Sequence, residues 1–236
     1  MRKVVYRAEN RGYTKSDWLD SYHTFSFGGF YDPNRTNFGT LRVLNDDYVQ
    51  PGRGFNLHPH GDIEIITVPL KGTLQHRDSQ GNIENIKEGD IQVITAGNGI
   101  EHSEFNASDT DEVNFLQIWI DPQKKALEPQ YDVMKFPFNR VNNDFLPIVV
   151  PNGDDSSLYI NQNAWMTYGN YKKDETAVYE LNEQENGVYI FVIEGEVNVD
   201  GDILKRRDGL GMEKLSDVPM VFEKESSFII FEIPMV

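Results

Sequence analysis

The chain has 236 residues, 39% of them hydrophobic and 25% charged, so it is long enough to form one large or two small globular domains. Its formal net charge of −16 disfavours direct binding to nucleic acid or to an anionic membrane surface, because like charges repel. The absence of cysteine excludes disulfides and thiolate metal sites, and no export signal or membrane span is predicted, so we expect a cytoplasmic protein.

Short strand patterns dominate the chain. Apolar and β-branched runs predict strands at residues 40–44, 63–70, 73–77, 91–95, 114–120, 189–193, 196–199 and 228–233. Turn-forming residues separate several of these runs, and no long amphipathic helix is predicted. So many short strands favour an all-β, antiparallel barrel or sandwich.

A faint internal repeat divides the chain. Residues 63–74 resemble residues 188–197, with Gly72 aligned on Gly195, and strand and turn patterns follow in the same order. The polar, proline-containing stretch after residue 120 is typical of a linker with a short helical turn. We therefore predict an N-terminal unit at 1–125, a linker at 126–143 and a C-terminal unit at 144–236.

Two pairs of ionisable side chains carry the chemical signal. His58 and His60 lie two residues apart, so in a strand both imidazoles point to the same face. About forty residues later, His102 and Glu104 form a second pair with the same spacing. Imidazole and carboxylate suit Fe(II), Mn, Co, Ni, Cu(II) or Zn, and four such ligands leave two positions open for substrate and dioxygen. Glu64 lies six residues after His58, and this even spacing would put both side chains on the same face of a continuous strand. Spacing alone therefore leaves two glutamates, Glu64 and Glu104, as candidate ligands.

The same residues carry a family resemblance. The patterns Gly-x5-His-x-His-x3-Glu, from Gly52, and Gly-x5-Thr-x-Gly-x4-His-x3-Asn, from Gly89, resemble the two cupin motifs. Residues 23–33, 38–60, 78–82 and 96–106 resemble the pirin family, especially bacterial pirin-like bicupins with quercetin dioxygenase activity. The resemblance implies two tandem cupin barrels of jelly-roll type.

The resemblance also implies a site and a reaction. Its metal ligands would be His58, His60, His102 and Glu104, with Glu104 also accepting the proton of the substrate hydroxyl. Glu64 would then form a buried hydrogen bond beside the ligands, with direct ligation as the alternative. The implied enzyme is a monomeric oxidoreductase that uses one divalent metal, foremost Fe(II), to open the central ring of a flavonol such as quercetin with O2, releasing carbon monoxide.

Two other functions are compatible with the same residues. Pirins are also known as regulators, so a redox-responsive metal protein that binds a protein partner is one alternative. A metalloenzyme that acts on a different small aromatic substrate is the other.

The C-terminal unit lacks the candidate ligands. The repeat places Leu181 and Glu183 where the first histidine pair stands, and Met220 and Phe222 near the places of the second pair. We expect a structural unit there, with an apolar ligand pocket as the alternative.

Other conspicuous residues have simpler interpretations. The aromatic side chains that follow His23, at residues 25, 27, 30 and 31, are expected to form core rather than a flavonol-stacking wall. His76 is predicted at the surface of a strand, and Arg42 as a paired charge. The acidic residues of 108–112 are expected in a solvated loop.

Overall fold

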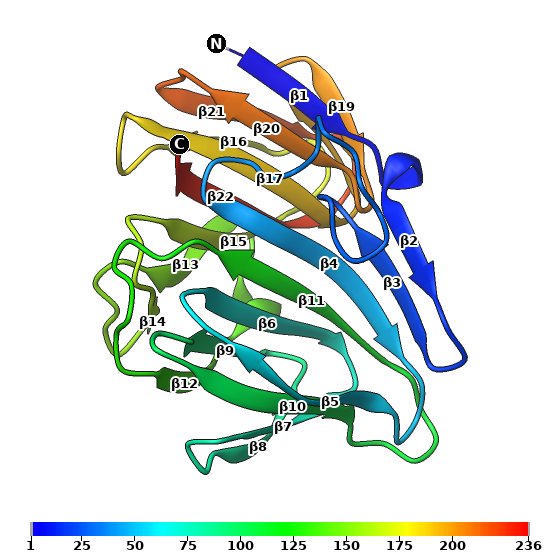
Figure 1. Ribbon diagram of the computed structural model, residues 1–236. Helices are drawn as coiled ribbons and strands as arrows, with labels where there is room; N and C mark the ends of the chain where they lie inside the picture. Colours follow the sequence, from blue (N-terminus) through cyan, green and yellow to red (C-terminus); the bar gives the residue numbers. More distant parts are fainter. Residues whose placement is uncertain (1, 236) are drawn as a thin grey trace.

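Antiparallel strand pairing organises residues 2–235, the part of the chain that this computed structural model describes (Figure 1). Within that range the helical segments are two one-turn 3-10 helices, η1 (Ala8–Asn10) and η2 (Phe138–Arg140). The second of these is the short helical turn predicted after residue 120. No helix among these residues is long and apolar enough to span a membrane.

Two sheets face each other and form the N-terminal barrel. The seven-stranded sheet comprises, in spatial order, β12 (Gln130–Lys135), β9 (Asp90–Thr95), β6 (Glu64–Lys71), β11 (Val113–Ile120), β4 (Leu41–Val49), β3 (Leu19–His23) and β2 (Gly12–Lys15). The four-stranded sheet comprises β5 (Gly54–His60), β10 (Ile100–Asn106), β7 (Thr73–Asp78) and β8 (Ile83–Lys87).

The C-terminal barrel repeats this arrangement. Its seven-stranded sheet comprises β1 (Arg2–Tyr6), β20 (Gly209–Glu213), β17 (Asn186–Glu194), β22 (Ser226–Pro234), β15 (Trp165–Tyr171), β13 (Asp144–Val150) and β14 (Leu158–Tyr159). Its four-stranded sheet comprises β16 (Thr176–Glu180), β21 (Asp217–Phe222), β18 (Glu196–Val199) and β19 (Asp202–Lys205). The predicted all-β class with two cupin units is confirmed, and each barrel is a pair of facing sheets.

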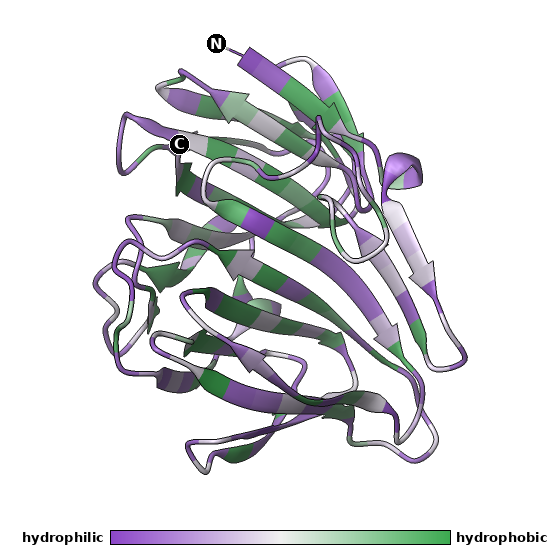
Figure 2. Cartoon of the chain, in the orientation of Figure 1, coloured by the Kyte–Doolittle hydropathy of each residue, from purple (hydrophilic) through white to green (hydrophobic). Residues whose placement is uncertain are grey.

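The two seven-stranded sheets pack against each other at the centre of the molecule. On β6, Ile66 and Val68 point into this shared core, where they join Met166 and Phe231 of the other barrel. The intervening residues, Ile65 and Thr67, point the other way, because strand side chains alternate between faces. Figure 2 shows hydrophobic residues concentrated on the strands and hydrophilic residues on the connecting loops. Each large sheet therefore has one face toward the other barrel and one toward its own interior.

The interiors of the two barrels differ in chemistry. The C-terminal interior is filled with apolar and aromatic side chains, and Tyr171 stacks on Phe222 there at 4.5 Å between ring centres. In the N-terminal interior, polar residues such as Gln92, Glu104 and Gln117 are buried instead. A polar interior is costly unless its groups are paired or used, so the N-terminal barrel is the candidate for chemistry.

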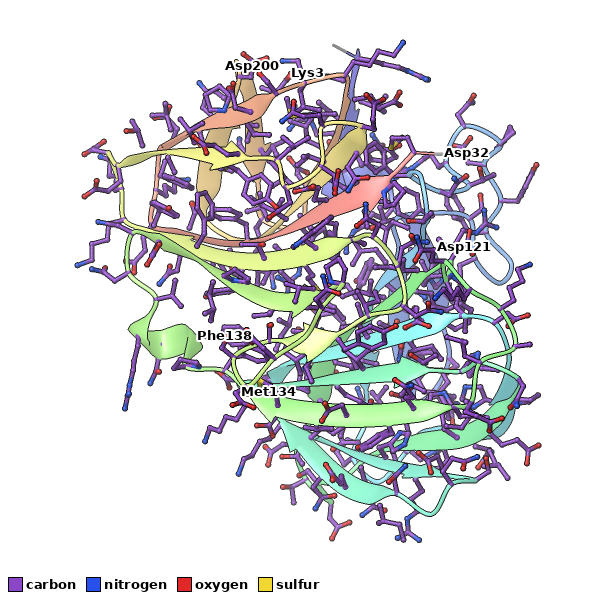
Figure 3. The ribbon with its side chains drawn as sticks, turned by 90° about the vertical axis from the view of Figure 1, so that its left-hand side faces the viewer. Lys3, Asp32, Asp121, Met134, Phe138 and Asp200 are labelled. Carbon is purple, nitrogen blue, oxygen red and sulfur yellow. The ribbon has the colours of Figure 1, made fainter. Side chains whose placement is uncertain are left out.

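Strand pairing differs from the predicted boundaries at both ends of the N-terminal unit. Strand β1 pairs with β20, so the first residues of the chain complete the C-terminal sheet, as Figure 1 shows. Figure 3 places Lys3 beside Asp200 of the C-terminal barrel, and their side chains form an ion pair at 3.0 Å. Strand β12, in the predicted linker, pairs with β9 of the N-terminal sheet. Both strands lie at sheet edges, and pairing by an edge strand from a distant part of the chain leaves no local sequence signal.

Candidate metal centre

Strands β5 and β10 bring three histidines together. They pair antiparallel with His58 directly opposite His102, and His60 follows two residues later on the same face. A Cβ atom at Gly54 would collide with the backbone of Glu104, so glycine is what allows β5 to approach β10 this closely. A register shift between His102 and Glu104 marks a β-bulge, a feature that re-aims side chains next to functional sites.

The three imidazoles form a compact cluster. Their candidate ligand atoms all lie within 4.8 Å of one another. The ring centres are 4.6 Å apart for His58 and His102, 4.9 Å for His58 and His60, and 4.8 Å for His60 and His102. The structure therefore brings three of the four predicted ligands, His58, His60 and His102, close together.

Hydrogen bonding prepares these rings to bind a cation. The Nδ1 atom of His58 donates to the carbonyl oxygen of Asn56 at 2.7 Å, which leaves its Nε2 atom unprotonated and free to ligate. Both ring nitrogens of His102 are buried without a hydrogen-bond partner among the described residues. A buried, unpaired imidazole nitrogen is costly, and a metal ion would satisfy it, so the donor set fits a divalent cation.

Burial keeps two of the three histidines, His60 and His102, neutral. Burial, together with the neighbouring imidazoles, lowers the pKa of His60 to about 4 and that of His102 to about 3. Neutral imidazole is the form that ligates a metal. At neutral pH these two histidines are therefore ready to bind without first losing a proton.

Glu104 lies beside the histidines but is not among the residues whose ligand atoms cluster. Its two oxygens accept hydrogen bonds from Gln117 Nε2 at 2.9 Å and from Thr67 Oγ1 at 3.3 Å. Burial raises the pKa of the Glu104 carboxyl, although the nearby histidines and these two donors oppose the shift. Ligation by Glu104 stays a prediction.

A cavity of about 540 Å³ opens onto the cluster. Besides the three histidines and Glu104, aromatic and aliphatic side chains line it, namely Trp18, Leu19, Phe27, Phe55, Leu57 and Trp119. Trp119 lies edge-on to His60, with 5.0 Å between ring centres, and Phe27 packs against Trp119 at 5.5 Å. The volume and the mostly apolar lining are typical of a small-molecule site.

Glu64 takes the buried hydrogen-bonding role rather than a place in the cluster. Its Oε2 atom accepts hydrogen bonds from Thr95 Oγ1 at 2.8 Å and from the Asn161 backbone N–H at 3.1 Å. It is not among the residues that line the cavity. The phase relation to His58 is broken because a turn separates β5 from β6, and on β6 Glu64 faces the C-terminal barrel.

His76 is the clearest error of the sequence prediction. It is fully buried instead of exposed, and its Nε2 atom lies 3.0 Å from the Asp78 carboxylate. Its ring stacks on Tyr131 and lies 5.5 Å from the ring of His102. A partner two residues away on the same strand made this burial possible, and the pattern His76-x-Asp78 was the available signal.

The remaining sequence expectations have mixed outcomes. Arg42 finds its partner in Asp121 at 3.8 Å. Phe25 is core, as expected, whereas Phe27 forms part of the cavity wall and Tyr31 is 74% exposed. In the C-terminal barrel, Met220 and Phe222 are buried among apolar side chains.

Sequence reasoning missed a polar part of the cavity wall. Ser21, His23, Asn45 and Asp47 from β3 and β4 line it together with Gln117 from β11. Gln117 interrupts the apolar pattern of the predicted strand at 114–120, and that interruption was a signal. Asn45 and Asp47 lie just beyond the strand predicted at 40–44, and as polar residues they do not continue its apolar pattern.

Comparison with protein families identifies both barrels. Residues 5–120 match the family described as Pirin, and residues 147–233 match the quercetinase C-terminal cupin domain.

Individual proteins extend the similarity to the whole chain. A quercetin 2,3-dioxygenase of Escherichia coli strain K12 is 38% identical over 230 residues, which cover 98% of each chain. A pirin-like protein of Caulobacter vibrioides is 35% identical over 216 residues, 91% of this chain and 92% of that one. The crystal structure of the bacterial pirin YhhW from Escherichia coli in complex with nickel(II) superposes with a TM-score of 0.94 at 36% identity and covers all of both chains.

Proposed function

Because the chain belongs to the pirin family, we propose that it is a metal-dependent dioxygenase of the quercetinase type, acting on flavonols such as quercetin. The observation that carries this proposal is the convergence of three imidazoles in a cavity with aromatic walls. Relatives named quercetin 2,3-dioxygenase and a nickel-bound relative support it.

The three histidines would hold one divalent ion. His58, His60 and His102 would supply three nitrogen ligands, and we propose the carboxylate of Glu104, which lines the same cavity, as the fourth. We propose Fe(II) as the native ion, with Mn, Co, Ni, Cu or Zn as alternatives, because this donor set accepts several first-row ions. Such an ion would act as a Lewis acid that acidifies the substrate hydroxyl.

The protein's own side chains would bind and orient the flavonol. Trp119 and Phe27 present ring surfaces against which a planar aromatic ligand can pack. The carboxylate of Glu104 would accept the proton of the hydroxyl on the central ring. Thr67 and Gln117 fix the orientation of the Glu104 carboxylate through hydrogen bonds. The overall reaction consumes one flavonol and one O2 and yields the ring-opened ester and one carbon monoxide.

Loading with single metals tests this proposal. Metal-free protein would be supplied in turn with Fe(II), Mn, Co, Ni or Cu, and the loss of quercetin absorbance and the release of carbon monoxide would be measured. We expect turnover above metal-only controls with at least one ion, and a loss of at least a hundredfold in Glu104→Gln, since general-base catalysis contributes about 10² to 10⁴. Turnover no faster than the metal-only controls with every ion would refute the proposed activity.

A further inference from the structure

Asp47 is a buried carboxyl that no cation balances among residues 2–235. It is 3% exposed and lines the same cavity as the histidine cluster. Its hydrogen bond among the described residues comes from the hydroxyl of Ser21, on the neighbouring strand β3.

The adjacent residue shows what a structural buried carboxylate looks like in this protein. Asp46 points to the opposite face of β4, where Arg207 Nε lies 2.9 Å and Arg11 Nη1 3.3 Å from its Oδ2 atom. The amide of Asn114 donates to its other oxygen at 2.8 Å. Asp46 is therefore fully paired, whereas Asp47, one residue later, has only a neutral partner.

A purely structural role does not account for Asp47. Burying an ionisable group with a single hydroxyl partner is unfavourable, and an apolar residue would pack there more stably. The C-terminal barrel shows an apolar alternative: Gly169 on β15 pairs with Phe228 as Asp47 on β4 pairs with Phe115, and the Phe228 ring fills the space over that glycine. Because a buried acid at this position does not stabilise the fold, we expect Asp47 to interact with a ligand in the cavity.

The position of Asp47 suits the far end of a long ligand. Trp119, which contacts His60, is paired with Val43 on β4. Asp47 lies four residues further along β4 and on the same face as Val43, so the two Cα atoms are about 13 Å apart at 3.3 Å per residue. Asn45 lies between them, with its Oδ1 atom 3.0 Å from Nδ1 of His23. The cavity thus has a metal-binding end and a hydrogen-bonding end.

We propose that Asp47, oriented by Ser21, binds a phenolic hydroxyl on a ring of the substrate remote from the metal, and so selects hydroxylated over unsubstituted aromatic rings. This inference rests on the proposed function, since the metal end of the cavity must first anchor the flavonol. In the ionised form Asp47 accepts a hydrogen bond from the phenol, and in the protonated form it donates one. Asp47 is then a specificity-determining residue that contacts the substrate without taking part in ring opening.

Three flavonols that differ only in their hydroxyl groups test the proposal. Quercetin has hydroxyls on both outer rings, galangin has none on the pendant ring, and 3′,4′-dihydroxyflavonol has none on the fused ring. Anaerobic dissociation constants, from quenching of tryptophan fluorescence, and kcat/KM in air would be measured for each. The proteins would be metal-loaded wild type, Asp47→Asn, Asp47→Ala and, as matched control, Asp20→Asn, in which the acid lies at the periphery on β3 and bonds Tyr13.

One of the two analogues is expected to bind wild-type protein about tenfold more weakly than quercetin, as for the loss of one hydrogen bond to a charged group. Asp47→Ala should abolish that difference by weakening quercetin alone, Asp47→Asn should reduce it, and Asp20→Asn should preserve it. Equal discrimination in wild type and both Asp47 variants would overturn the proposal while leaving the proposed function intact. If wild-type protein neither binds nor consumes any of the three flavonols, both fall.

Discussion

Replacing Asp47 by asparagine should stabilise the metal-free protein at high pH. The pKa of this carboxyl is raised from 3.8 to about 7, chiefly by burial and to a smaller extent by the negative charges of Asp46 and Glu104, against the hydrogen bond from Ser21. Below pH 3.8 the carboxyl is protonated in both the folded and the unfolded chain. Between pH 3.8 and 7 only the unfolded chain releases the proton, so the free energy of unfolding falls as the pH rises.

The magnitude follows from the pKa difference. Each pKa unit corresponds to about 1.4 kcal/mol, so ionisation of Asp47 costs the folded state about 4 kcal/mol at pH 8 and about 2 kcal/mol at pH 5. Asparagine does not ionise. The stability of Asp47→Asn relative to wild type should therefore increase by about 2 kcal/mol between pH 5 and pH 8, whatever the substitution does to packing.

Urea denaturation in EDTA at pH 5, 6, 7 and 8 measures this difference, because the linear extrapolation gives the free energy of unfolding at each pH. Asp20→Asn serves as control. The Asp20 carboxyl accepts a hydrogen bond from Tyr13 that lowers its pKa, so it is ionised throughout this range and its replacement should not change the pH dependence. Parallel stability curves for wild type and Asp47→Asn would refute the assignment of Asp47 as a buried, uncompensated acid.

Two further substitutions test the central core and the cavity wall. Arg207→Ala should lower the free energy of unfolding by about 3 kcal/mol or more, because it leaves the buried Asp46 with Arg11 as its remaining cation. Urea denaturation measures this loss, and a change below about 1 kcal/mol would contradict the prediction. Phe27→Ala should raise KM for quercetin severalfold without changing the metal content, because Phe27 packs against Trp119 in the cavity wall and is not one of the clustered histidines. Steady-state kinetics measure KM and elemental analysis measures the metal content. Loss of metal would assign Phe27 a structural role instead.

The fold was largely predictable because its main signals are local. Each predicted strand from 40–44 to 228–233 lies on a strand of the structure, since apolar runs bounded by turn residues report burial directly. The pairing of β1 with β20 was not predictable, because it joins residues about 200 positions apart through backbone hydrogen bonds that carry no side-chain code.

The metal-binding part of the cavity could be predicted from the sequence, whereas its polar wall on β4 could not. The His58 and His102 pairs stand out because ligand spacing is a sequence pattern. Asn45 and Asp47 instead interrupt the apolar pattern of β4, so the pattern does not predict that this strand continues to Val49. Turn-forming residues within a buried strand contradict local propensity, and such conflicts are expected at functional sites.

Metal analysis of three proteins tests the three-histidine site most directly. Wild type, His102→Ala and His23→Ala would be purified without added metal and measured by elemental analysis. His23 is a matched control, because it lines the same cavity but is bonded to Thr14 and Asn45 and is not in the cluster. We predict about one first-row transition ion per chain in wild type and His23→Ala, and none in His102→Ala. Equal metal content in wild type and His102→Ala would contradict the site.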